Sequence, residues 1–395
     1  MDETNNTHNG MMQPAPAQII AVGGGKGGIG KSVLSIAMAL TLADLGKKVV
    51  LVDADLGGAN LHTMLGVYMP RYTLYDFYTR RIDDLNKLIL PTPVKHLDLI
   101  CGAAGSIGMA DIRYWEKLKT IRHLQKLPAE FVIVDLGAGA SFNEIDLFNA
   151  AHTGIVVAQP EPTSIQECYH FVKVALFRAL RRAFLDSPGV IAMLDECADP
   201  THGHDKRTIT ELAERVREQD VRLGVRFYKL INSYSPKLLL NKVHDHREYA
   251  DGLSLQLAMQ DMLRIKLEYW GYLKFAPRLH EALRSLRPME IIAPNSDMRH
   301  KMLRIVKKFI LREKIDYQAP GARLISPITE IRRQKERDKL HKVEQRICSV
   351  LCPLWETCTL RDGGRPCRMP DNEFKLRTEG RAGDQPKVEL PGKSS

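Results

Sequence analysis

Two lysines in a glycine-rich stretch are the first residues whose types and spacing could do chemistry. The segment GGGKGGIGKS, residues 23–32, follows the apolar run QIIAV and precedes KSVLSIAMALTLADLG, which has helical spacing. Gly25, four further residues, Gly30, Lys31 and Ser32 match G-x-x-x-x-G-K-[ST], in which backbone N–H groups surround phosphate oxygens. Lys31 is expected to reach the β- and γ-phosphates, and the Ser32 hydroxyl to bind Mg²⁺. The stretch predicts a nucleotide site with Lys31 as a catalytic residue.

The other lysine, Lys26, is not needed to hold phosphates on its own chain. With Lys26, the loop resembles the K-G-G-x-G-K-[ST] motif of the MinD/ParA family of P-loop ATPases. In that family the extra lysine reaches the phosphates bound by the other subunit of a dimer that encloses the nucleotide. The resemblance implies that ATP holds two copies of this chain together through Lys26, which would act in catalysis, and that hydrolysis releases them. The loop residues expected to contact the nucleotide are Gly25, Gly27, Gly28, Ile29, Gly30, Lys31, Ser32 and Val33.

Carboxylates follow two further apolar runs. Asp53 follows residues 49–52 and Asp135 follows residues 131–134. Both runs read as buried parallel strands, and α/β sheets bind ligands at the carboxyl ends of such strands. By resemblance, Asp135 binds Mg²⁺ through water and Asp53 supports the Mg²⁺ shell.

The segment D-x-D-x-x-x-x-N that starts at Asp53 stands where the family has its first switch. The resemblance gives Asp55 the task of orienting the attacking water and places Asn60 at the nucleotide. The alternative for Asp55 is a turn residue before the glycines at 57 and 58.

Two later segments are expected to contact the base. VRFYKLINSYSP reads as a strand that ends at Asn232, where the family has an asparagine whose amide can pair with adenine. YWGYLKFAPRLHEALRSLRPM resembles the strand and loop that close over the base, with the backbone of residues 275–277, Pro277 included, near it. This segment and DADLGGANL also resemble the FlhG flagellar-number regulators within the family.

The elements that must position these residues alternate along the chain. The runs QIIAV, KVVLV, LDLIC, FVIVD, GIVVA, RFYKLIN and EYWGYL are separated by helical segments. This order predicts an α/β fold with a mostly parallel central sheet and helices on both faces. The predicted organisation is a disordered tail (1–17), an ATPase domain (18–317), a linker and charged helix (318–346), a cysteine module (347–370) and a disordered tail (371–395). Within the ATPase domain, residues 185–223 are predicted to be an insertion that holds a helix capped by Thr208 or Thr210.

The cysteine module has four cysteines within twenty residues. They are Cys348, Cys352, Cys358 and Cys367, spaced C-x3-C-x5-C-x8-C. Four thiolates make a closed metal site. Structural zinc usually takes C-x2-C pairs, which are absent, whereas a [4Fe–4S] cluster tolerates irregular spacing and a neighbouring proline such as Pro353. A [4Fe–4S] cluster is favoured over zinc and over unligated thiols, and all three stay open.

Composition limits the class of protein. The chain has 395 residues, of which 44% are hydrophobic and 26% charged, with seven cysteines and a net charge of +10. No stretch approaches about 18 uninterrupted apolar residues, so no membrane span is predicted. Cysteines without secretory signals indicate the reducing cytoplasm. The helix MRHKMLRIVKKFILREKI is interpreted as core packing, and peripheral membrane or non-specific DNA contact is possible but not favoured.

These features together predict a slow, Mg²⁺-dependent ATP hydrolase, activated by dimerisation or by a partner. Its output would be a homodimer in the ATP-bound state that positions or assembles a partner protein of unknown identity. One alternative is an Mrp-like iron–sulfur carrier scaffold, although the C-x-x-C cysteines typical of those relatives are absent. A second alternative is an ATPase with a zinc-stapled docking tail.

Overall fold

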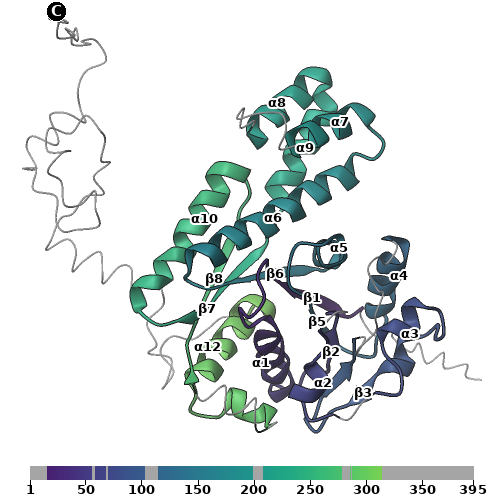
Figure 1. The fold of residues 1–395 in the computed structure, drawn as a ribbon, viewed down its shortest axis with the longest axis vertical. Coiled ribbons are helices and arrows are strands. Elements are labelled where there is room, and N and C mark those ends of the chain that lie inside the picture. The colour runs from purple at the N-terminus through teal and green to yellow at the C-terminus, as the bar shows by residue number, and fades with distance from the viewer. Residues whose placement is uncertain are drawn as a thin grey trace, which may run out of the picture. The chain divides into compact units, whose positions relative to one another are not determined.

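The computed structural model describes residues 16–55, 58–67, 70–102, 114–198, 208–277, 285 and 287–313 (Figure 1). The chain divides into two units, Met1–Ala322 and Arg323–Ser395, and all described residues belong to the first. The predicted cysteine module, linker, C-terminal tail and residues 1–15 of the N-terminal tail lie outside the described residues, so these predictions stay untested. The predicted disordered tail is wrong at its last residue, because Ala17 is 1% exposed and its N–H donates to the backbone oxygen of Gln125 at 2.9 Å.

One sheet forms the centre of the fold. Its strand order is β3-β4-β2-β5-β1-β6-β7-β8. Every pair of neighbouring strands is parallel except β3 with β4. The strands are β1 (Gln18–Gly23), β2 (Val49–Asp53), β3 (Leu90–Pro91), β4 (Leu97–Ile100), β5 (Phe131–Asp135), β6 (Thr153–Ala158), β7 (Lys237–Val243) and β8 (Glu268–Lys274). The predicted mostly parallel α/β fold is confirmed.

Helices connect the strands and cover the sheet. Those before β6 are α1 (Lys31–Asp44), α2 (Leu61–Met64), α3 (Leu74–Tyr78), η1 (Leu85–Leu88), α4 (Tyr114–Leu124) and α5 (Phe142–Ala150). Those after it are α6 (Pro162–Ala183), α7 (Pro188–Ala198), α8 (Ile209–Gln219), α9 (Val221–Ser233), η2 (His246–Glu248), α10 (Tyr249–Leu263), η3 (Pro288–Ile292), α12 (Asp297–Ile305) and the π-helical turn η4 (Val306–Ile310). Within the described residues no helix is both long and apolar enough to cross a membrane.

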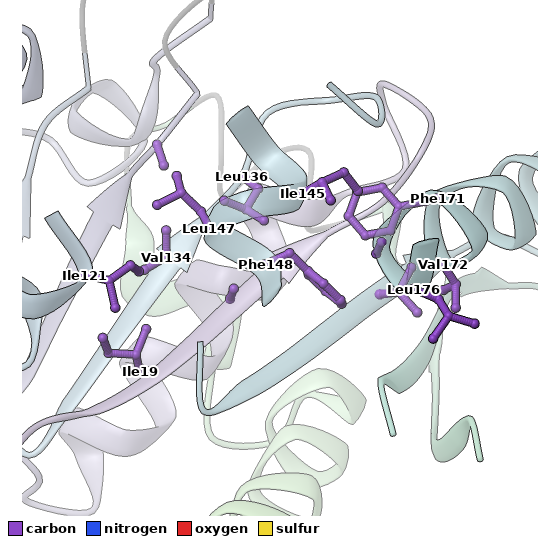
Figure 2. Packing of buried hydrophobic residues seen from close by; sticks show 14 of the residues in the cluster. Ile19, Ile121, Val134, Leu136, Ile145, Leu147, Phe148, Phe171, Val172 and Leu176 are labelled. Atoms are coloured by element: carbon purple, nitrogen blue, oxygen red, sulfur yellow. The ribbon is translucent and has the colours of Figure 1, made fainter. Parts of the chain in front are cut away.

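The strands are apolar on both sides, which is why both faces carry helices. Side chains alternate along a strand, so Ile19 and Ala21 join one buried cluster while Ile20 and Val22 join the other. Helices α4, α5, α6 and α10 cover the first face, and α1 and α12 cover the second (Figure 1). Figure 2 shows side chains of α5 and α6 from the first cluster, with Phe148 beside Phe171. This double burial holds the carboxyl ends of the strands in a fixed row.

One predicted strand is wrong. The run RFYKLIN is part of helix α9, and the strand on that side of β6 is β7, with sequence KLLLNKV. Phe227 and Ile231 are four residues apart and both buried, which is helical spacing. Asp220 caps the helix by accepting hydrogen bonds from the N–H groups of Arg222 and Leu223. Helix capping and spacing therefore outweigh the β-forming residues in this run.

The segment predicted as an insertion, residues 185–223, contains α7, α8 and the start of α9. Thr208, and not Thr210, caps α8. Its hydroxyl accepts the N–H of Glu211 at 3.2 Å, and the Glu211 carboxylate accepts the N–H of Thr208 at 3.1 Å. The boundaries of the insertion stay a prediction.

The basic helix near the end of the described chain packs into the core. Met302, Ile305, Val306 and Ile310 are buried in the cluster on the α1 face of the sheet, and Phe309 stacks on Trp270 with 4.9 Å between ring centroids. The interpretation of this segment as core packing is confirmed for residues 297–313.

Candidate nucleotide site

The glycine-rich loop joins β1 to α1 at the carboxyl edge of the sheet. Gly28 and Gly30 have positive φ angles of 75° and 94°, which side chains disfavour. A Cβ on Gly25 would lie 2.5 Å from the backbone oxygen of Glu167, and one on Gly30 would lie 2.3 Å from Asn241 Nδ2. The loop is thus pressed against α6 and β7, and only glycine fits at these positions. The backbone is shaped as a cradle, with α1 starting directly behind it.

Lys31 is the first residue of α1 and is only 8% exposed. Its Nζ donates to the backbone oxygen of Lys26 at 3.3 Å, so the side chain folds back over the loop. Burial lowers the pKa of Lys31, while Asp135, Asp55 and Glu144 oppose this by attraction. A buried ammonium over a glycine cradle fits the phosphate chain of a nucleotide.

Asp135 ends β5 beside Lys31 and is 1% exposed. Burial raises its pKa to about 7, although hydrogen bonds from Ser32 and Ser35 favour the charged form. The Ser35 hydroxyl lies 2.8 Å from Asp135 Oδ1 and 3.1 Å from the backbone oxygen of Lys31. Ser35 was not predicted, although it stands three residues after Ser32, on the same side of the helix.

Asp53 ends β2 and is the register partner of Asp135 on β5. Its carboxylate accepts the backbone N–H groups of Asp55, Asn60 and Leu61 at 3.0 to 3.2 Å. Burial nevertheless raises its pKa to about 6. Two buried carboxylates at adjacent strand ends, with the Ser32 hydroxyl nearby, are the hard oxygen donors that Mg²⁺ takes, so the residues fit this ion.

Asp55 makes the turn contact that was the alternative expectation for it, and its carboxylate also approaches the loop after β5. Its Oδ1 accepts the N–H of Gly58 at 2.9 Å, which is a turn contact. The same oxygen lies 3.4 Å from the point where a Cβ on Gly137 would stand, and the carboxylate attracts Lys31. Asp55 therefore reaches the loop after β5. Asn60 contributes its backbone N–H to Asp53, and its residue surface is exposed.

We expect Asp53→Asn to change how stability depends on pH in protein without nucleotide or Mg²⁺. A folded-state pKa of about 6, raised from 3.8, means that the folded chain holds the Asp53 proton more tightly. The stability that this proton contributes is therefore lost as pH rises through about 6. Between pH 5 and pH 7 the wild type should lose about 1 kcal/mol of unfolding free energy relative to the variant. Denaturant titrations in a chelating buffer measure this, and parallel pH profiles would contradict it.

Comparison with known proteins decides the family. The family model ParA, described as NUBPL iron-transfer P-loop NTPase, matches residues 16–216, just over half of the 395 residues. The chain belongs to the MinD/ParA family of P-loop NTPases.

Curated relatives agree with this. Antiactivator FleN of Pseudomonas aeruginosa is 34% identical over 160 residues, which cover 40% of this chain and 56% of FleN. Septum site-determining protein MinD of Escherichia coli (strain K12) is 30% identical over 153 residues, which cover 38% of this chain and 56% of MinD. The matched part spans about half the length of these relatives.

The solved structures show the fold. The MinC:MinD cell division protein complex of Aquifex aeolicus matches with a TM-score of 0.51 at 20% identity, covering 76% of this chain and 98% of that chain. Apo McdA of Cyanthece matches with a TM-score of 0.50 at 13% identity, covering 74% of this chain and 98% of that chain.

Lys26, the additional lysine of this MinD/ParA-family loop, lies at the rim of the candidate nucleotide site. Lys26 Nζ is 3.3 Å from Glu161 Oε2 and 3.2 Å from Thr163 Oγ1, and the Lys26 side chain is 42% exposed. Glu161 is the N-cap residue of α6, and neither it nor Thr163 was predicted to take part. In this structure Lys26 is therefore held by α6 of its own chain and stays accessible.

The base side of this MinD/ParA-family site differs from the prediction. Asn232 is exposed on α9, which leads into the amino end of β7, and β7 runs parallel to β6 and β1. Asn232 thus lies at the edge of the sheet opposite the loop, and its assignment as a base-contacting residue at a strand end is wrong.

Two residues of β7 contact the glycine-rich loop at the edge of the sheet where Asn232 had been expected. Asn241 is 4% exposed and its Nδ2 donates to the backbone oxygen of Ile29 at 2.8 Å. Lys242 Nζ donates to the backbone oxygen of Gly28 at 2.8 Å. The rings of His244 and Phe275 stack 4.7 Å apart just beyond the ends of β7 and β8. Pro277 closely follows β8, as the sequence predicted.

The cysteines give no metal site within the described residues. Cys348, Cys352, Cys358 and Cys367 lie outside them, and the described part of the chain holds no group of three or more candidate metal-ligating His, Cys, Asp or Glu side chains. Cys101 and Cys168 are buried free thiols, and burial raises the pKa of each to about 12. Thiols buried in this way are inert core residues.

Proposed function

We propose that this chain is an ATP-hydrolysing molecular switch that forms a homodimer with ATP bound and releases it after hydrolysis. The observation that carries the proposal is the buried Lys31, which lies on a glycine cradle and is surrounded by carboxylates from three separate elements. Burying a cation is costly, so a purely structural role explains the position of Lys31 poorly. The polyanionic phosphates of ATP are a ligand that fits both this ammonium and the glycine cradle.

The residues divide the work of binding and hydrolysis. The backbone N–H groups of the loop and the start of α1 would hold the phosphates, and Lys31 would neutralise charge as it develops on the γ-phosphate. Ser32, Asp53 and Asp135 would hold Mg²⁺, with Ser35 fixing the rotamer of Asp135. When bound, Mg²⁺ would offset the negative charge of the phosphates. Asp55 would orient the attacking water.

The position of Lys26 supports the proposed dimer. Its ammonium is at the rim of the site and partly exposed, where a second copy of the chain could present phosphates. A lysine supplied by the other copy neutralises phosphate only when the dimer forms, which couples ATP to association. FleN is an antiactivator and MinD is a septum site-determining protein. They support an output in which this chain regulates a partner rather than making a product.

ATP hydrolysis and ATP-driven dimerisation test the proposal. The mass of the full-length protein is measured by light scattering with Mg²⁺ and ADP, ATP or a non-hydrolysable ATP analogue. A dimer with the analogue and a monomer with ADP supports the switch. A single mass in all three states contradicts it.

A second candidate function, an iron–sulfur carrier or scaffold, is supported by the description of the matching family model as an iron-transfer NTPase and by the four clustered cysteines. The absence of a C-x-x-C pair from the whole sequence favours the switch with its own metal module. We propose a [4Fe–4S] cluster at Cys348, Cys352, Cys358 and Cys367, with zinc as the alternative.

Metal analysis separates these readings. Protein purified without oxygen should be brown and contain about four irons and four sulfides per chain. Replacing Cys352 and Cys358 with serine should remove the colour, whereas Cys101→Ser and Cys168→Ser should leave it. Colourless protein with one zinc would favour the docking tail, and transfer of the cluster to an apo-protein would favour the carrier.

A further inference from the structure

A fourth carboxylate faces the nucleotide site and has no assigned function. Glu144 stands in the first turn of α5, shortly after Asp135 and the glycines that follow it. The Ser141 hydroxyl caps this helix by accepting the N–H of Asn143 at 3.2 Å, and it donates to Glu144 Oε2. Ser141 therefore holds Oε2 of the Glu144 carboxylate, and Oε1 points in another direction.

The other oxygen of Glu144 points to the position that Asp55 also approaches. A Cβ placed on Gly137 would lie 3.2 Å from Glu144 Oε1 and 3.4 Å from Asp55 Oδ1. Both carboxylates also attract the Lys31 ammonium, which places them on the phosphate side of the loop. Two carboxylates from elements almost ninety positions apart in the sequence therefore converge beside Gly137, which has no side chain to separate them.

Helix α5 is anchored so that Glu144 keeps this direction. Two positions further on, Asp146 is buried and pairs with Arg178 of α6 at 2.9 Å and with Arg182 at 2.6 Å. Positions i and i+2 lie on different sides of a helix. The Asp146 side of α5 is thus fixed to α6, and the Glu144 side is turned toward the loop.

Two carboxylate acceptors at one position suit a water molecule. A water that donates one hydrogen to each carboxylate has its oxygen lone pair free to attack. We propose that Glu144 is a second catalytic carboxylate of the hydrolytic site, sharing the attacking water with Asp55. This inference rests on the proposed ATPase function.

The reaction balances without another reactant. The water oxygen forms a bond to the γ-phosphorus, and the bond from that phosphorus to the β–γ bridging oxygen breaks. ADP leaves with the electron pair of that bond. One water proton passes to Asp55 or Glu144 and then to solvent, and the products are ADP and inorganic phosphate.

The variant Glu144→Gln tests this assignment. The amide oxygen can still accept from Ser141, so the cap of α5 is kept, but the NH₂ group cannot accept a hydrogen from water. We expect kcat to fall at least tenfold, because general-base carboxylates contribute about 100- to 10,000-fold and Asp55 remains. KM for ATP, binding of a non-hydrolysable analogue and analogue-driven dimerisation should stay within twofold. A purely structural role would change binding as well.

The matched control and a double variant complete the experiment. Glu130→Gln alters an exposed glutamate that pairs with Lys47 at the opposite edge of the sheet, and it should leave kcat unchanged. If one water is shared, Asp55→Asn and Glu144→Gln together should lower kcat by less than the product of the single effects. A wild-type kcat in Glu144→Gln, or equal losses of kcat and analogue binding, would overturn the inference. If the wild-type protein hydrolyses no ATP above the Lys31→Met background, the proposed function itself has failed.

Discussion

Replacing Lys31 with methionine is expected to lower kcat/KM for ATP by about 100- to 1,000-fold, the range for losing one preorganised charge-stabilising group. Methionine keeps the apolar stem of a side chain that is almost completely buried, so the core below the loop is not disturbed. The ammonium, however, is the cation that Asp135, Asp55 and Glu144 all attract. Without it, these carboxylates repel the phosphates, and both ATP affinity and the rate should fall.

The measurement uses hydrolysis assays and titration with a fluorescent ATP analogue. Lys47→Met is the control, because Lys47 follows the same helix but pairs with Glu130 away from the loop. That variant should bind and hydrolyse ATP like the wild type. If Lys31→Met bound the analogue with unchanged affinity, Lys31 would not contact the phosphates, and the loop would need another ligand.

The parts of the site that are local in sequence could be predicted, and the rest could not. The loop, Lys31, Asp53 and Asp135 each stand next to a buried strand, so a short pattern fixes both the residue and its edge of the sheet. Ser35, Glu144 and Asn241 take their positions from tertiary packing. Ser35 meets Asp135 and Asn241 meets Ile29 across one hundred residues or more. No local spacing contains that information.

The misplaced strand has a different cause. The run at residues 226–232 is rich in apolar and aromatic residues, which favours a strand in isolation. Asp220 at the cap and the buried pair Phe227 and Ile231 make it a helix. The strand that was missed begins directly after Pro236, and its three consecutive leucines are typical of a strand buried on both faces. The helix-capping residue Asp220 was the signal in the sequence that could have distinguished helix α9 from strand β7.

Helix α6 connects the hydrolytic site with the exposed lysine. Near its end, Arg178 holds Asp146 on the helix that carries Glu144. At its start, Glu161 and Thr163 hold Lys26. A shift of α5 on hydrolysis would therefore reach α6 directly, and α6 contacts the lysine proposed to join two copies. The release of Lys26 from Glu161 can therefore be tested by replacing each residue and measuring dimerisation.

Replacing Lys26 with glutamine should abolish ATP-driven dimerisation and leave nucleotide binding by the monomer largely intact, because Lys26 contacts α6 and not the cradle of its own chain. Without dimers, the hydrolysis rate should fall to the basal level of the monomer. Sedimentation at several protein concentrations with a non-hydrolysable ATP analogue measures the first effect. Unchanged dimerisation would refute the contact in trans.

Glu161→Gln is the matched variant, and the opposite result is expected from it. The Lys26–Glu161 pair is largely exposed, and such pairs contribute about 0.2–1 kcal/mol. Removing the charge of Glu161 frees Lys26, so the analogue-bound dimer should form at a concentration about two- to thirtyfold lower, since two lysines are released per dimer. If Glu161 restrains Lys26 in the monomer, the analogue-bound dimer should be tightest in Glu161→Gln, intermediate in the wild type and weakest in Lys26→Gln. A weaker dimer in Glu161→Gln would instead place Glu161 in the interface, where its carboxylate contacts the second copy.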